Sequence, residues 1–85
     1  MKTKVNRTNI TDHLIQHQLE IIGKTMSDVK DDERWYDNNT ITQEQQNQLE
    51  AYAIPLLKKV FKFNKSKAEM TFSWFILQFG LRIKN

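Results

Sequence analysis

The sequence predicts an all-α fold, a small single-core bundle of three or four helices with a short extended C-terminal tail. Apolar residues recur at helical spacing in three separate segments, and two of these segments follow a capping-box pattern. A length of 85 residues supplies only one hydrophobic core. With 39% hydrophobic and 27% charged residues, the composition is that of a globular chain. We therefore expect residues 1–85 to form a single helical domain.

The first helix is expected to begin after Asn9, a favoured N-cap residue with an acidic residue, Asp12, three positions later. Its apolar side chains lie within half of a helical wheel. They are Leu14, Ile15, Leu19, Ile21, Ile22 and Met26. Gly23 lies inside this pattern and weakens a helix by about 1 kcal/mol relative to Ala. We expect the helix to end early or to fray toward Met26.

Residues 27–40 have a weaker hydrophobic pattern. Ser27 and Asp28 can cap a short helix that runs through Tyr36, with Val29, Trp35 and Tyr36 as its apolar side. The turn-forming residues 37–40 compete with a regular backbone ladder and predict a connection after it.

A long amphipathic helix is expected from Gln43, because Thr42 and Gln45 form a capping box. Its apolar face extends to Phe63, with lysines on the opposite side. Pro55 removes one backbone hydrogen bond inside this helix. Since the apolar face keeps its phase across the proline, we expect a kink near residues 52–54 rather than a restart.

A third helix is predicted from about Lys67 to Phe79, between a second capping box at Ser66 and Glu69 and a stop signal at Gly80. It is apolar on two sides. The first side comprises Ala68, Phe72, Phe75, Ile76 and Phe79, and the second comprises Met70, Trp74 and Leu77. After it, the tail from residue 81 to 85 alternates apolar and cationic residues, which suits a short strand or an extended arm.

A helix that is apolar on two sides needs a second cover. Three covers remain open: the acidic segment that carries Trp35 and Tyr36, a second copy of the protein, or a foreign partner. The candidate partner or oligomer interface therefore comprises Trp35, Tyr36, Met70, Trp74 and Leu77.

Charge is segregated along the chain, although the net charge is only +3. Residues 25–50 contain seven Asp or Glu against two Lys or Arg, and residues 51–85 contain seven Lys or Arg against one Glu. The two ends either neutralise each other in the fold or remain available to a partner.

Lysines occupy five of the ten positions from 58 to 67. We expect Lys58, Lys62 and Lys65 to share one helical stripe that points away from the core. Such a stripe releases counterions from a polyanion and favours phosphate contact over base readout, because lysine is a point charge. The predicted nucleic-acid-binding set is Lys58, Lys59, Lys62, Lys65, Lys67, Arg82 and Lys84. An ordinary solvated helix face is the alternative interpretation.

The segment around Trp35 and Tyr36 offers a second contact of this kind. Together with Arg34, Asn38 and Asn39, these aromatic residues suit stacking and base-edge contacts with single-stranded RNA. Covering the core is the alternative role for the two aromatic side chains.

Catalytic and metal-binding patterns are missing from the sequence. The chain has no Cys and only two His, so His13 and His17 cannot complete a tetrahedral zinc site by themselves. The acidic residues 28–37 lack the glycine and register of an EF-hand and suit a solvated face, and the two glycines exclude a glycine-rich phosphate loop. We therefore expect no enzyme, no metal, no cofactor and no small-molecule substrate.

These observations predict a non-catalytic, small, basic regulatory protein that binds RNA or DNA backbone through a lysine stripe. The alternative is a stoichiometric inhibitor or adaptor that docks through the apolar helix face, with nucleic acid able to bridge the pair. Ten Lys against three Arg, with seven Asn and eight Ile, are typical of an AT-rich genome. A phage-type factor against a host nuclease or toxin, resembling an antitoxin in its role, fits that alternative. With no signal-peptide pattern and no membrane span, we expect a cytoplasmic protein.

Overall fold

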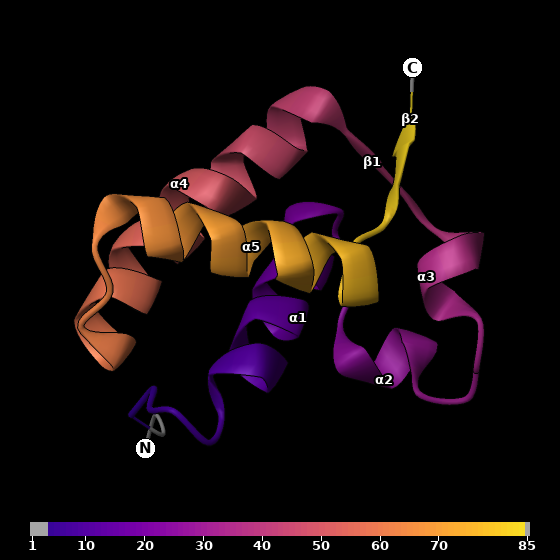
Figure 1. Cartoon of the computed structure of the whole chain (residues 1–85). Coiled ribbons are helices and arrows are strands. Elements are labelled where there is room, and N and C mark those ends of the chain that lie inside the picture. The colour runs from indigo at the N-terminus through magenta and orange to yellow at the C-terminus, as the bar shows by residue number, and fades with distance from the viewer. Residues whose placement is uncertain (1–3, 85) are drawn as a thin grey trace.

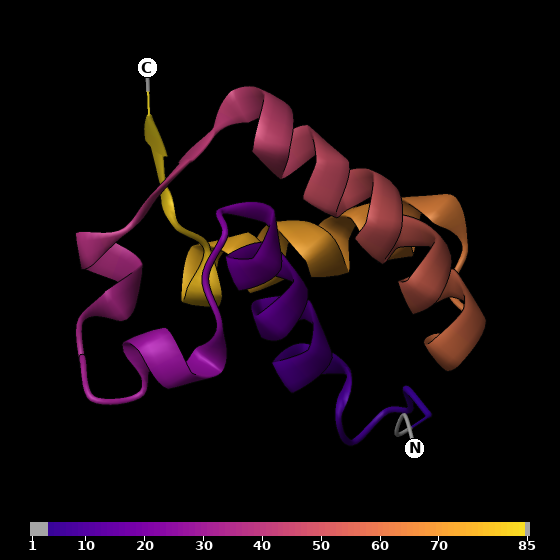
Figure 2. The ribbon, with the colours of Figure 1, turned by 180° about the vertical axis from the view of Figure 1, so that it is seen from behind.

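The computed structural model describes residues 4–84, of which 67% are helical (Figures 1 and 2). Its elements in chain order are α1 (Ile10–Ile21), α2 (Met26–Val29), α3 (Trp35–Asn38), β1 (Thr40–Thr42), α4 (Gln43–Phe61), α5 (Lys65–Phe79) and β2 (Arg82–Lys84). The helices α1, α4 and α5 are long, whereas α2 and α3 are single turns. The prediction of a mostly helical fold is confirmed for the described residues, and the flattened molecule measures 34 × 33 × 18 Å.

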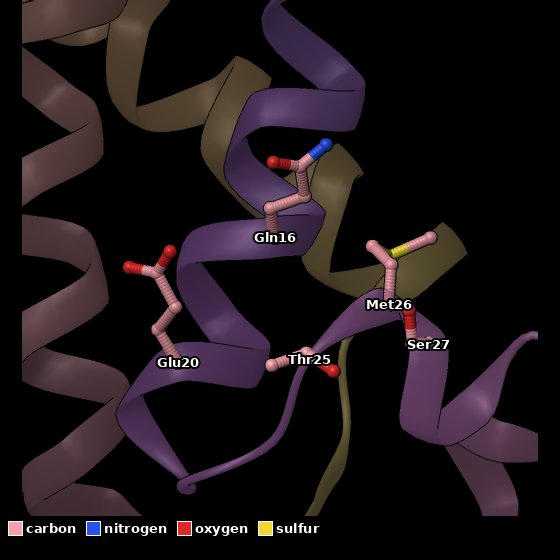
Figure 3. Close-up of a pocket in the computed structure, with 5 residues that line it drawn as sticks. All are labelled: Gln16, Glu20, Thr25, Met26 and Ser27. Atoms are coloured by element: carbon pink, nitrogen blue, oxygen red, sulfur yellow. The ribbon is translucent and has the colours of Figure 1, made fainter.

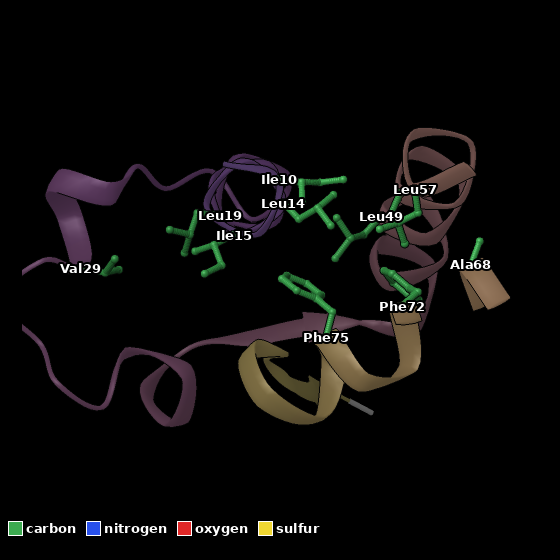
Figure 4. Packing of buried hydrophobic residues seen from close by; sticks show 11 residues of the cluster. Ile10, Leu14, Ile15, Leu19, Val29, Leu49, Leu57, Ala68, Phe72 and Phe75 are labelled. Carbon is green, nitrogen blue, oxygen red and sulfur yellow. The ribbon is translucent and has the colours of Figure 1, made fainter. Parts of the chain in front are cut away.

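The three long helices share one hydrophobic core (Figure 4). Side chains of α1, α4 and α5 point into the same space, and Val29 of α2 closes one side of it. The buried cluster comprises Ile10, Leu14, Ile15, Leu19, Val29, Leu49, Ala53, Leu57, Ala68, Phe72 and Phe75. The first predicted face of the third helix is therefore the face that packs into the core.

Helix α1 ends at Ile21, shortly before Gly23, which adopts a left-handed backbone conformation. Gly23 has φ +80°, its amide donates to the Glu20 carbonyl, and the Lys24 amide donates to the Leu19 carbonyl. This pattern is a Schellman motif, which closes a helix at a glycine. The predicted early end is confirmed, and Met26 belongs to α2 rather than to the first helix.

The single helix predicted through Tyr36 is wrong, because the chain forms two separate turns. Thr25, rather than Ser27, precedes α2, and its amide donates to the Asp28 carboxylate over 2.8 Å. Asp32 then accepts from the Arg34 amide over 3.0 Å and from the Asn38 side chain over 2.9 Å. Such side-chain bonds replace the helical backbone ladder. They allow the helical turn to restart at Trp35, so that residues 37 and 38, predicted as part of a break, end α3.

The capping box of α4 is confirmed. The Gln45 amide donates to the Thr42 hydroxyl over 3.0 Å, and the Thr42 amide donates to the Gln45 side chain over 2.9 Å. Helix α4 then continues through Pro55 without a restart. A bend of its axis at Pro55 stays a prediction.

The predicted capping box of the third helix is wrong. Helix α5 begins at Lys65, two residues earlier than expected, and Asn64 is its N-cap. The Asn64 side chain accepts from the Lys67 amide over 2.8 Å. Lys62 has a left-handed φ of 60°, which ends α4 and turns the chain back toward Asn64.

A short parallel sheet makes the fold less than purely helical. β1 pairs with β2 in the register Thr40↔Arg82, Ile41↔Ile83 and Thr42↔Lys84. The tail is therefore a strand, one of its two predicted forms, whereas β1 was not predicted because three residues carry too little periodicity. Ile41 and Leu81 are buried beside this sheet. Residues 1–3 and 85 of the predicted domain lie outside the described part of the chain.

Two glutamines link α1 to the other long helices. Gln18 is fully buried, and its amide nitrogen donates to the Phe79 carbonyl over 3.0 Å. Gln45 similarly donates to the Ile21 carbonyl over 3.2 Å. Carbonyls in the last turn of a helix have no helical partner. These side chains therefore satisfy the end of one helix while holding it against another.

We predict that the two glycines respond differently to the same substitutions. Gly23 has a left-handed backbone, but there is open space around it. Gly23→Ala should therefore lower the free energy of unfolding by about 1–2 kcal/mol, and Gly23→Asn should lower it less, since Asn tolerates that conformation. At Gly80 a Cβ atom would lie 2.4 Å from the Ile76 carbonyl oxygen. Gly80→Ala and Gly80→Asn should therefore both lower the free energy of unfolding by about 1–3 kcal/mol. Urea unfolding followed by circular dichroism measures both pairs, and a stable Gly80→Ala variant would contradict the steric explanation.

Candidate functional surfaces

The predicted lysines lie around the turn between α4 and α5, and all of them are exposed. Because α4 ends at Phe61 and α5 begins at Lys65, the prediction that Lys58, Lys62 and Lys65 share one helical stripe is wrong. The left-handed Lys62 places them on two helices and the turn that joins them. We call this surface the basic turn and define it as Lys58, Lys59, Lys62, Lys65 and Lys67 together with Arg7.

Arg7 belongs to the basic turn because the fold brings it to the phenylalanines there. The rings of Phe61 and Phe63 stack with centroids 5.0 Å apart and planes at 13°. The Arg7 guanidinium lies 5.8 Å from the Phe61 centroid, and the Lys67 ammonium lies 5.0 Å from the Phe63 centroid. Cations at these distances are attracted to the ring faces. The basic N-terminus is expected to help the lysines in nucleic-acid contact, but the sequence does not place Arg7 beside these rings, because no local spacing relates residue 7 to residue 61.

The charge of the basic turn is largely left without internal partners. Lys65 lies 3.9 Å from the Glu69 carboxylate, and both side chains are exposed, so this pair contributes little. In the stretch from residue 4 to 84, no other lysine of the turn has a carboxylate oxygen within 4.0 Å. The positive charge therefore faces solvent.

Five of the ten acidic residues lie on α2, α3 and the loop between them, at the opposite end of the molecule from the basic turn (Figures 1 and 2). We call this region the acidic pole and define it as Asp28, Asp31, Asp32, Glu33 and Asp37. Hydrogen bonds from the Thr25 amide and hydroxyl lower the pKa of Asp28, and bonds from the Asn38 side chain and the Arg34 amide lower the pKa of Asp32. These carboxylates stabilise local turns, so the two charged regions do not neutralise each other.

Arg82 and Lys84, the two remaining predicted cations, lie on β2. Both views place this strand away from the basic turn, on the side of the molecule where α3 lies (Figures 1 and 2). Both residues are exposed. The structure therefore brings Arg7 to the five lysines but does not bring Arg82 and Lys84 to them.

The second predicted side of α5 is exposed to solvent. The exposed fractions of Met70, Trp74 and Leu77 are 70%, 55% and 83%. Trp35 is half-buried against the core and contacts Tyr36 edge to face, while Tyr36 itself is 40% exposed. Within the described residues the acidic segment therefore leaves the second side of α5 uncovered. We call Met70, Trp74 and Leu77 the apolar α5 face.

A third feature, which sequence reasoning missed, joins α1 to α4 through Tyr52. The His17 ring stacks on the Tyr52 ring with centroids 3.8 Å apart and planes at 17°. His13 shares a hydrogen bond between its Nε2 atom and the Tyr52 hydroxyl. Only the crossing of the two helices brings the three rings together.

The histidines line a shallow groove of about 610 Å³ that also contains Asp12 and Glu20. Burial lowers the pKa of His17, the nearby Glu20 carboxylate opposes this change, and the charge of His13 adds to it. In the range 4–84, no three side chains of the His, Cys, Asp or Glu type come together as a metal site. Beside this groove, the contacts of His13 and His17 with Tyr52 hold α1 against α4.

A smaller hollow of about 280 Å³ lies between the end of α1 and α2 (Figure 3). Its lining residues are Gln16, Glu20, Thr25, Met26 and Ser27. Glu20 is the only ionisable group among them, and general acid–base chemistry needs a positioned proton donor or acceptor with a matched partner.

Comparison of the chain with protein-family models, with curated proteins and with solved structures found no match. Among the described residues, none of the helices combines the length and the apolar character that crossing a bilayer requires. The functional interpretation therefore depends on the geometry and charge of the surfaces described above.

We predict that the stability of the protein falls as the pH decreases below about 6.5. Because burial lowers the pKa of folded His17 below its unfolded value near 6.5, the unfolded chain binds more protons in this range. Stability is therefore fully present above that pH and is lost as the pH falls toward the folded pKa. The urea midpoint should decrease between about pH 7.5 and pH 5.5, and His17→Gln should flatten this decrease. Asp28 and Asp32 titrate at lower pH, so an unchanged slope in His17→Gln would contradict the prediction.

Proposed function

We propose that the protein is a non-catalytic regulatory protein that binds the phosphate backbone of RNA or DNA through the basic turn. The observation that carries this proposal is the gathering of five exposed lysines and Arg7 on one turn, opposite the acidic pole. Of these six cations, only Lys65 has a carboxylate partner among the described residues. A polyanion therefore finds a concentrated positive surface with its charge available.

The chemistry of the turn favours backbone contact. Lysine ammonium groups neutralise phosphates and release their condensed counterions, which makes the affinity strongly dependent on salt. The turn has one guanidinium group, Arg7, and its contact with Phe61 holds it over a ring face. Bidentate recognition of base edges requires arginine or amide side chains that reach into a groove. We therefore propose binding with little sequence preference.

Three finer features accompany this proposal. Helices α1, α4 and α5 form the bundle, with α4 bent at Pro55 because proline crowds the carbonyl four residues before it. Arg82 and Lys84 on β2 provide a separate, weaker contact for an RNA or DNA strand that is long enough to reach them. The protein acts in the cytoplasm. A chain without cysteine forms no disulfide and therefore needs no oxidising compartment.

We predict that neutralising the basic turn weakens nucleic-acid binding and flattens its salt dependence. The variant Lys58→Gln/Lys59→Gln/Lys62→Gln removes three charges, so the slope of log affinity against log salt should become shallower by about 2 to 3. Fluorescence anisotropy with labelled single-stranded and double-stranded oligonucleotides at several salt concentrations measures this slope. The matched control, Arg82→Gln/Lys84→Gln, should change the slope much less. If the triple variant keeps the wild-type slope, the basic turn is not the binding surface.

A second candidate function is favoured by the exposure of the apolar α5 face. Here the protein is a stoichiometric inhibitor or adaptor, a phage-type factor that neutralises a host nuclease or toxin and can be bridged to it by nucleic acid. The separated charges of the basic turn and the acidic pole would steer such an encounter. Exposed apolar surface of this kind is typical of interaction sites on small proteins.

Purification from the native host separates the two candidate functions. A protein that binds nucleic acid is expected to show a high ratio of absorbance at 260 to 280 nm that falls in high salt. An inhibitor that docks through apolar contacts is expected to retain its protein partner after nuclease treatment and in high salt. Retention of neither nucleic acid nor protein at low salt would contradict both.

A further inference from the structure

We propose that the apolar α5 face joins two copies of this chain, with their α5 helices packed antiparallel. This inference does not depend on nucleic-acid binding, because the contact is made by the side of α5 opposite the core, and the charge of the basic turn enters only through the direction of the pairing. Four properties of the face support it: its size, its spacing, its mostly uncharged borders and the direction of charge along the helix.

The face is large for a surface that remains in water. Met70, Trp74 and Leu77 are each more than half exposed, and Leu77 is 83% exposed. Three such side chains present on the order of 400 Å² of apolar surface, as much as the largest patch on many monomeric proteins. A standard interface buries about 800 Å² on each partner. The apolar face supplies about half of that area, and the polar residues around it would supply the rest.

The spacing of the face suits a second helix. Met70, Trp74 and Leu77 follow one another at four and then three positions, which is the repeat of a helix–helix seam. Small Ser73 lies beside Trp74 and is exposed, which leaves room for a large ring from an opposing helix. A globular partner with a flat surface would not need this regular repeat.

The borders of the face are compatible with a copy of themselves. Ser66, Ser73 and Gln78 flank the seam on the helical wheel and carry no charge, whereas Lys67 lies on the seam three residues before Met70. In a two-fold symmetric contact each surface meets itself, so like charges at the border would repel. Antiparallel pairing keeps the two copies of Lys67 at opposite ends of the seam, so this repulsion does not arise between them.

The direction of the pairing follows from the charge along the helix. The basic turn lies at the start of α5, and the acidic pole lies near the end of α5 (Figures 1 and 2). Antiparallel pairing brings the basic turn of each copy to the side of the acidic pole of the other copy. Parallel pairing would bring like charges together. The charges of the basic turn and the acidic pole therefore favour the antiparallel arrangement, although Arg82 and Lys84 on β2 offset part of the acidic charge.

The same geometry defines a register. A two-fold axis between Ser73 and Trp74 places Met70 of each copy opposite Leu77 of the other copy. The two positions of residue 73 then lie close together, while the two positions of Ser66 lie apart. With a rise of 1.5 Å per residue, the starts of the two α5 helices are separated by roughly 25 Å along the axis.

Analytical ultracentrifugation tests the dimer. The wild-type chain should sediment as a dimer, and Trp74→Gln and Leu77→Gln should each raise the dissociation constant on the order of 30-fold or more, as expected for central interface residues. Both side chains are exposed, so circular dichroism and the melting temperature of the monomer should be retained. The matched control, Tyr36→Gln, removes an exposed aromatic ring away from the face and should leave the dissociation constant unchanged. A wild-type chain that remains monomeric at about millimolar concentration overturns the proposal.

Cysteine cross-linking tests the direction. The chain contains no Cys, so a single introduced thiol reports one position. Under mild oxidation Ser73→Cys should form a disulfide-linked dimer, whereas Ser66→Cys should remain a monomer in denaturing electrophoresis. Cross-linking of both variants indicates parallel pairing and overturns the antiparallel arrangement. Cross-linking of neither, or of Ser66→Cys alone, overturns the use of this face between two copies.

Discussion

The structure depends on one constraint: the chain can close only one hydrophobic core, and α5 carries apolar side chains on two sides. Ala68, Phe72 and Phe75 fill the core with α1 and α4, so the opposite side of α5 has no place inside the molecule. Burial of apolar surface is the main favourable contribution to folding. Covering the three large apolar side chains that α5 leaves in water would therefore be favourable. For this reason the apolar α5 face is the surface from which we infer a partner.

Local hydrogen bonds keep the charges of this molecule apart. The carboxylates of Asp28 and Asp32 accept bonds from nearby amides, which holds the acidic residues to the turns of α2 and α3. The lysines gather around the turn between α4 and α5, where the left-handed Lys62 reverses the chain. Since each charged region is stabilised within its own segment, the fold does not need to bring them together. The proposed binding of a polyanion and the proposed orientation of a partner both rest on this separation of charge.

The long helices are also linked by polar side chains that act at helix ends. Gln18 joins α1 to the last turn of α5, and Gln45 joins the end of α1 to the start of α4. Tyr52 adds a third link between α1 and α4 through its contacts with His13 and His17. Carbonyls at helix ends remain without partners unless a side chain supplies a donor. These contacts therefore select one packing of the three helices among those that the apolar faces would allow.

The sequence by itself determined the features that depend on neighbours within a few residues. The capping box at Thr42, the end of the first helix near Gly23 and the two apolar sides of α5 all follow from local spacing. Tertiary structure decided the rest: β1 needs β2 as its partner, Asn64 caps α5 because of the preceding turn, and Arg7 reaches the lysines because α1 packs beside α4. The physical reason is the distance along the sequence over which each effect acts. Capping hydrogen bonds and helical periodicity act between residues a few positions apart. The exposure of Trp74 and the position of Arg7 depend instead on how the whole chain packs around its single core.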